Sequence, residues 1–176
     1  MGIAKEFVIE KTRIDYKGIF DLNGLLVEMR KWIGVRKFEF HERKFIIKSG
    51  DEGTEYEIEW ECNRKINTYV KFYITVVIKG RGAHPVEVIK NGNKLEQVQG
   101  MFNFTLGGRA ELDWENRFGK KWYLKYLMDF YNNYIIKKDI LYVWGDELTY
   151  RVYKLHRLIK DHLDMESKTN PSEGRF

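Results

Sequence analysis

The clearest polar pattern in the sequence is a run of four glutamates, Glu55, Glu57, Glu59 and Glu61, at every second position. Because successive side chains of a strand leave opposite faces, these carboxylates share one face of a sheet, where they could bind a cation or a basic partner. Neighbouring members are about 7 Å apart along the strand, too far for two carboxylates to share one proton. The pattern therefore favours a solvated face whose glutamates meet basic side chains such as Lys71 across the strands.

The other reactive side chains do not form a catalytic or metal-binding motif. Cys62 lies on the apolar face of the same strand, where burial raises the pKa of a thiol and favours a core role over a nucleophile. His156 and His162 are six positions apart, about 240° around a helix, so they cannot chelate a metal from one face. We therefore predict no catalytic residue, no metal ligand and no cofactor, and an enzyme ranks below a binding protein.

Aromatic side chains support the first binding hypothesis. Tyr123, Tyr126, Phe130 and Tyr134 belong to a predicted helix over residues 122–136, whose apolar arc of about 200° is twice the usual width. A helix of this kind needs cover from more than one side. The four residues are predicted to line a ligand cavity, because an aromatic body with a hydroxyl group can both bury and orient a ligand. The alternative is that they are ordinary core residues.

A second binding hypothesis concerns nucleic acid. Tyr69, Lys71 and Tyr73 share the polar face of a strand predicted over residues 69–79, and rings interleaved with a cation can stack exposed bases. The formal net charge of +5 agrees with an anionic partner, although 31 basic and 26 acidic residues mostly describe a solvated surface. The motif of an RNA-recognition domain is absent. The alternative is that the rings pack across strands or against a helix.

These side chains must be positioned by a strand-rich chain with helices on both sides of it. Asp21 is predicted to cap a helix that ends near Gly34, where a left-handed residue is expected. Residues 36–113 then read as antiparallel strands, with a bulge or turn within 41–44. The second half of this block is divided at two places, by Gly80, Gly82 and Pro85 and by a turn at Gly107-Gly108. About six to seven strands are expected in total.

The C-terminal part of the chain is predicted to be helical. After the helix over 122–136, an extra helix over about 146–164 places Leu148, Val152, Leu155, Ile159 and Leu163 on one face. Packing within the chain is the default for this row, and a homo-oligomer through the C-terminal helix is the alternative. The fold class is α+β, with an N-terminal helix and a curved antiparallel sheet against a long C-terminal helix. We expect one domain over residues 1–165 and a disordered tail over 166–176.

This element order resembles the helix-grip arrangement of START-like and Bet v 1-like proteins, in which a curved sheet wraps around a C-terminal helix. The resemblance covers most of residues 1–136 and rests on the order of elements. It implies a cavity between sheet and helix that holds an apolar ligand. The competing interpretation is a two-layer α+β domain whose interior is filled by side chains.

Composition limits the setting and the function. The chain has 176 residues, a single cysteine and no apolar run long enough to span a membrane, which favours a cytoplasmic protein without an internal disulfide. The sequence thus predicts a non-enzymatic binding protein for an apolar small molecule or a protein partner. RNA or DNA binding through a basic and aromatic surface is the alternative.

Overall fold

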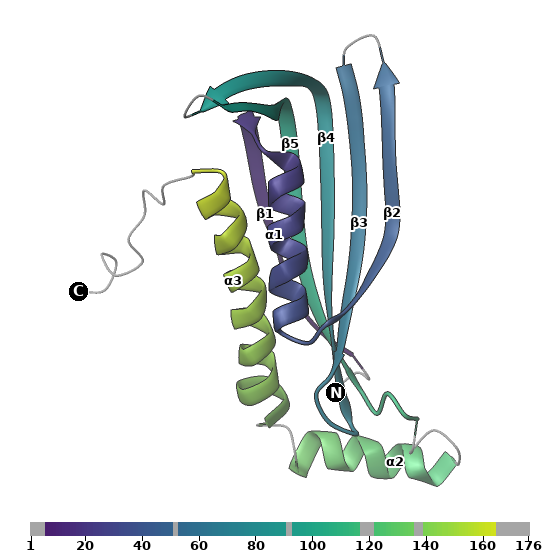
Figure 1. The fold of residues 1–176 in the computed structure, drawn as a ribbon. Coiled ribbons are helices and arrows are strands. Elements are labelled where there is room, and N and C mark those ends of the chain that lie inside the picture. The colour runs from purple at the N-terminus through teal and green to yellow at the C-terminus, as the bar shows by residue number, and fades with distance from the viewer. Residues whose placement is uncertain (1–5, 51–52, 91–92, 117–121, 136–138, 165–176) are drawn as a thin grey trace, which may run out of the picture.

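The computed structural model describes residues 6–50, 53–90, 93–116, 122–135 and 139–164. The strands are β1 (Glu6–Phe20), β2 (Glu39–Gly50), β3 (Gly53–Lys65), β4 (Val70–Lys90) and β5 (Asn93–Leu112). The helices are α1 (Leu22–Val35), α2 (Trp122–Phe130) and α3 (Asp146–His162), with π-helical segments η1 (Tyr131–Ile135) and η2 (Asp139–Gly145) between the last two. Figure 1 shows one open sheet with two helices along one face, which confirms the α+β class.

The sheet is antiparallel throughout, and its strand order is β1-β5-β4-β3-β2. Consecutive strands from β2 to β5 pair as hairpins, whereas β1 pairs with β5 from the other end of the strand block. Helix α1 therefore connects the two edge strands of the sheet. This order brings residues of the N-terminal strand beside residues nearly a hundred positions later.

The predicted number of six to seven strands is wrong, because β4 and β5 are each a single long strand of 21 and 20 residues. β4 continues through Gly82, which adopts a φ of 58°, with a register shift between Arg81 and His84. This is a bulge, in which one strand bends without ending. Figure 1 shows the β4–β5 hairpin bending over the helices beyond this point.

Gly107 and Gly108 lie inside β5 and do not form the predicted turn. A β-carbon at position 108 would lie only 2.8 Å from Cδ1 of Ile9 and 3.2 Å from Cγ of Leu148. Glycine at this position thus allows β1 and α3 to approach the backbone of β5 closely.

Helix α1 begins as predicted and ends differently. The Asp21 carboxylate accepts a hydrogen bond from the amide of Gly24 at 2.8 Å, as an N-cap does. At the other end, Lys37 and not Gly34 adopts the left-handed conformation, with a φ of 58°. The amide of Phe38 donates to the carbonyl of Ile33 and that of Lys37 to Gly34, which is the hydrogen-bond pattern of a Schellman motif. The motif turns the chain from α1 directly into β2.

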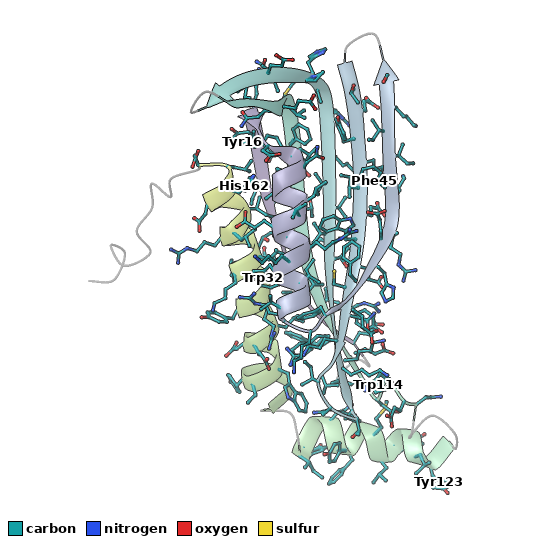
Figure 2. The ribbon with its side chains drawn as sticks, in the orientation of Figure 1. Tyr16, Trp32, Phe45, Trp114, Tyr123 and His162 are labelled. Carbon is teal, nitrogen blue, oxygen red and sulfur yellow. The ribbon has the colours of Figure 1, made fainter. Side chains whose placement is uncertain are left out.

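The core lies between α1, α3 and the sheet face that they cover, which we call the inner face. Alternate residues of β4 point into it, and all of them are fully buried: Val70, Phe72, Ile74, Val76 and Ile78. The predicted row of α3, from Leu148 to Leu163, is buried in the same layer, so its packing within the chain is confirmed. His162 links the helices, with Nδ1 at 2.9 Å from Glu28 Oε2 (Figure 2).

The helix that lies along the sheet is α3, and not the helix predicted over 122–136. α2 lies across one end of the sheet (Figure 1), and the rings of this segment are largely exposed. The expectation that the sheet encloses this helix is therefore wrong. Within the described residues, no helix reaches the length and hydropathy that crossing a bilayer requires. The tail predicted over 166–176 lies outside the described residues.

Candidate functional site

The segment that follows α2 is fixed to the body of the protein by buried contacts. The hydroxyl of Tyr69, directly before β4, donates to Oδ1 of Asn132 at 2.5 Å, and the Asn132 side chain is fully buried. The ring of Tyr131 packs edge-to-face on that of Tyr69, with centroids 5.8 Å apart. Burial raises the pKa of Tyr69 to about 12, so its hydroxyl stays protonated and remains a donor. Helix α2 is thus held at its C-terminal end.

The opposite side of this segment presents a group of apolar side chains to solvent, which we call the aromatic surface. It consists of Tyr123, Tyr126, Leu127, Phe130 and Tyr134. On a helix of 100° per residue, the first four fall within about 100° of arc. The rings of Phe130 and Tyr134 are stacked, with centroids 5.1 Å apart, which continues the surface from α2 into η1. The side chains of Tyr126 and Tyr134 are 70% and 77% exposed, respectively.

The four residues predicted to bind a ligand are therefore brought together on one surface, although not around an enclosed space. The sequence indicated that the helix carries too much apolar surface for a solvent-facing element. It could not show what covers that surface, because the pattern is the same for a core helix and for a binding helix. Asn132 is polar and fully buried, so the segment contacts the body through a polar residue and exposes most of its rings.

The five side chains of the aromatic surface carry no charge, although lysines flank the segment in the sequence, at positions 120, 121, 137 and 138. The charged residues of segment 122–136 are Lys125 and Asp129, whose formal charges cancel, whereas the whole chain has a net charge of +5. A group of exposed apolar side chains of this kind is typical of a surface that another macromolecule covers.

The predicted nucleic-acid residues do not form one exposed surface. Tyr69 contacts Asn132 through its hydroxyl and Tyr131 through its ring. The ring of Tyr73 is contacted by cations, with Arg109 Cζ at 4.1 Å and Lys71 Nζ at 5.0 Å from its centroid. Its hydroxyl donates to Glu111 at 2.8 Å, and burial together with this carboxylate raises the pKa of Tyr73 to about 12. Both rings are engaged in contacts within the chain.

The glutamates of β3 meet basic side chains of the neighbouring strand β2, as the sequence favoured. Lys44 Nζ lies 2.6 Å from Glu57 and Arg43 Nη2 lies 2.9 Å from Glu61. The contact with Lys44 lowers the pKa of Glu57, with smaller contributions from Lys79 and Lys48. The partners are residues of β2 and not Lys71, because Lys71 lies opposite Lys65 beyond the end of the glutamate run.

The reactive side chains that the sequence singled out are not assembled into a catalytic group. Cys62 is fully buried on the inner face, and burial raises the pKa of its thiol to about 12. Burial also lowers the pKa of His156. Within the described part of the chain, no three His, Cys, Asp or Glu side chains are close enough together to hold a metal ion.

Comparisons of the chain with protein-family models, with curated proteins and with solved structures found no match. Geometry is therefore the basis for inferring what the protein binds. The fold and this site define an α+β protein with an anchored aromatic surface at one end of its sheet.

Proposed function

We propose that this is a non-enzymatic binding protein whose partner is another protein, and that a second copy of this chain is a partner of the aromatic surface. The observation that carries the proposal is the exposure of Tyr126, Phe130 and Tyr134 on a segment that is anchored through Asn132. Tyrosine and other large aromatic residues supply most of the binding energy in many protein interfaces.

A second copy fits this surface because an isologous contact places the same patch on both sides. The five residues that make up the patch are uncharged, so the patch residues themselves bring no like charges together.

The size of the surface sets the expected strength of binding. The four aromatic side chains are exposed by about half to three-quarters, so together they present on the order of 500 Å² of surface to solvent. Two copies would then bury on the order of 1,000 Å² in total, at the lower limit for specific interfaces. We therefore expect a reversible dimer with a dissociation constant in the micromolar range rather than an obligate one.

An apolar small molecule is less well supported as the ligand. A helix-grip cavity would lie beneath the helix that covers the sheet, but the inner-face residues under α1 and α3, such as Phe72, Phe104 and Leu106, are fully buried. The interior is filled there in the manner of a two-layer domain.

Sedimentation equilibrium of the whole chain over a concentration range from about 1 to 100 μM tests this proposal. We expect the wild-type protein to pass from monomer to dimer within the range. The double variant Tyr126→Lys/Phe130→Lys should remain monomeric, because two ammonium groups in each patch would have to be desolvated. Val27→Lys, at an exposed position of α1, is the matched control and should dimerise like the wild type.

Two results would reject a second copy as the partner. One is a wild-type protein that stays monomeric up to the highest concentration. The other is a dimer that the double variant and the control form equally well. Far-ultraviolet circular dichroism of each variant shows that the fold is retained, since none of the three side chains is buried.

A further inference from the structure

The outer face of the sheet, opposite α1 and α3, carries a trough of about 650 Å³ across β1, β5 and β4. Strand register places its residues in three rows. The rows are Arg13–Thr105–Val77, Asp15–Asn103–Lys79 and Lys17–Met101–Arg81, each running from β1 through β5 to β4. Rows two residues apart lie about 7 Å from each other along the strands.

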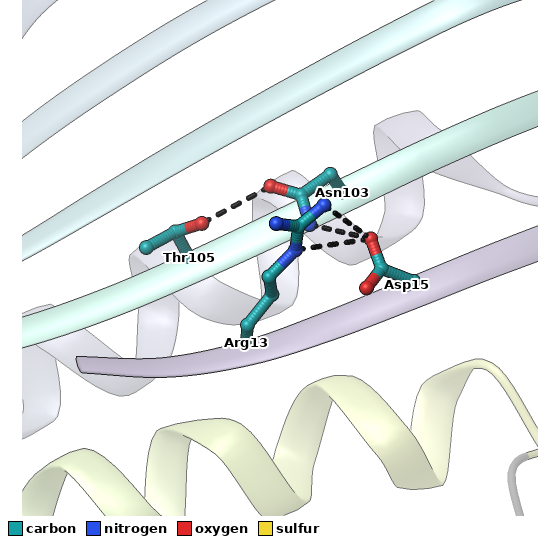
Figure 3. Close-up of polar contacts among 4 residues, drawn as sticks. All are labelled: Arg13, Asp15, Asn103 and Thr105. Carbon is teal, nitrogen blue, oxygen red and sulfur yellow. Dashed lines mark hydrogen bonds and ion pairs between the residues drawn. The ribbon is translucent and has the colours of Figure 1, made fainter.

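The middle of the trough is a fixed polar network (Figure 3). Thr105 Oγ1 donates to Asn103 Oδ1 at 3.1 Å, and Asn103 Nδ2 donates to Asp15 at 2.7 Å. Arg13 donates to the same Asp15 oxygen through Nε and Nη2, at 3.2 and 3.0 Å. The hydrogen bonds from Asn103 and Arg13 lower the pKa of Asp15, so its carboxylate is charged at neutral pH and neutralised by Arg13. The carboxylate in the trough is thus already partnered.

The remaining charges in the trough are positive. Lys17, Lys79 and Arg81 make no ion pair with any described residue. Glu57 lies opposite Lys79 in the register of β3 and β4, but it contacts Lys44 at 2.6 Å on its other side. The glutamate run of β3 borders the trough, so an anion is attracted to β1 and β4 and repelled from β3.

The floor between these cations is partly apolar. Met101 is 56% exposed and lies in one row between Lys17 and Arg81. A second hollow of about 190 Å³ shares Val77 and Thr105 with the trough and continues it to Val8 and Lys11. From Lys17 to Lys11 the path along β1 is about 20 Å. Both cationic and apolar side chains therefore occur along a path with the length of several nucleotides.

We propose that this outer-face trough binds single-stranded nucleic acid, with phosphates on Lys17, Lys79 and Arg81 and base faces on Met101 and Val77. A compact anion would need donors that converge on one point, whereas Lys17 on β1 is separated by the width of β5 from Lys79 and Arg81 on β4, about 10 Å across the strands. A duplex presents phosphates without free base faces, and a sulfated polysaccharide presents charges alone, so neither uses the apolar floor. The site differs from Tyr69, Lys71 and Tyr73 and does not depend on the aromatic surface.

Fluorescence anisotropy with a labelled oligothymidylate of about 12 nucleotides tests the proposal on the full chain. We expect binding that weakens as salt rises, with a slope of about −0.7 per contacted phosphate in a plot of log K against log salt. Lys79→Gln/Arg81→Gln should lower affinity about tenfold and reduce the magnitude of the slope by about 1.4. Lys154→Gln/Arg157→Gln, exposed on α3, removes the same charge from the helical side and should change neither.

The variant Met101→Ala separates the contribution of base contact to binding from the contribution of charge. It should weaken binding of the oligothymidylate severalfold with an unchanged salt slope, and it should leave binding of a heparin fragment unaffected. The proposal is overturned if the wild-type chain does not bind the oligothymidylate at low salt, or if the two double variants lose affinity equally. It is also overturned if a duplex of equal charge binds as tightly and Met101→Ala has no effect, because the trough would then be a non-specific polyanion surface.

Discussion

Two helices of this protein carry similar numbers of apolar residues and use them in opposite ways. The apolar row of α3 is buried against α1 and the sheet, with Leu148, Leu155 and Ile159 fully covered. Four apolar residues of α2 are exposed to solvent, and its neighbour η1 contacts the body through Tyr131 and Asn132. Amphipathic sequence alone therefore does not tell a core helix from a binding helix. The difference lies in what the rest of the chain leaves available to cover each one.

Stability measurements should show the largest difference between these two helices. Leu155→Ala removes a fully buried side chain from α3 and should lower the free energy of unfolding by about 2–5 kcal/mol, because it leaves a cavity. Tyr126→Ala removes a larger side chain from α2 and should change the free energy of unfolding by no more than about 0.5 kcal/mol. Urea denaturation at a concentration below dimer formation measures both. Equal losses would mean that the aromatic surface belongs to the core.

A second prediction concerns the close approach of α3 to β5. Gly108→Ala should cost about 1–3 kcal/mol, because the added methyl group meets Ile9 and Leu148. Gly34→Ala is the matched control, since a β-carbon there meets nothing within 4 Å and the residue lies in α1. This control should stabilise the protein by about 0.5–1 kcal/mol. A neutral Gly108→Ala would show that α3 does not rest on β5 at this point.

Changes at the N-terminus of α1 should have a smaller effect on stability. Asp21→Ala removes the carboxylate that accepts from the amide of Gly24 and should cost about 1 kcal/mol in thermal or urea unfolding. Asp21→Asn keeps an acceptor at the same position and should retain most of the stability. If both variants behave alike, the cap does not contribute to folding.

The smallest effect concerns the outer face and depends on pH. Lys44 lowers the pKa of Glu57, so the pair stabilises the folded state above the ordinary glutamate pKa of about 4.3 and loses this contribution as pH falls through the lowered value. Glu57→Gln should therefore be less stable than the wild type at pH 7, and this difference should vanish at pH values well below the lowered pKa. Glu10→Gln, at an exposed position of β1, should show no such pH-dependent difference. A difference that persists in acid would exclude the ion pair as its cause.

Local signals in the sequence predicted local structure well. Asp21 as a cap, the bulge within 41–44 and the buried row of α3 all depend on residues a few positions apart, and the structure confirms each of them. Glycine was the ambiguous residue. Gly82 and Gly107 read as strand ends, but one forms a bulge and the other lies within a strand, because glycine also permits bends and close approaches.

The pairing of strands that are distant in the chain could not be predicted from the sequence. Asn103 and Asp15 are 88 positions apart, and their hydrogen bond exists only because β1 pairs with β5. The same holds for the outer-face trough, whose cations come from strands that are distant in the chain. For α2, the width of the apolar arc indicated that something must cover the helix. The composition of the helix could not show whether the sheet or a partner covers it, since the covering surface would be apolar in both cases.

Hydroxyl-radical footprinting of the whole chain, at concentrations below and above dimer formation, tests the central claim most directly. At low concentration, Tyr126, Phe130 and Tyr134 should be strongly modified, because their side chains are exposed. At high concentration, all three should become protected, whereas Met101 on the outer sheet face keeps its reactivity. Protection of the three rings at every concentration would contradict the account, because they would then be covered within a single chain. Equal modification at all concentrations would contradict it too, because no second copy would cover them.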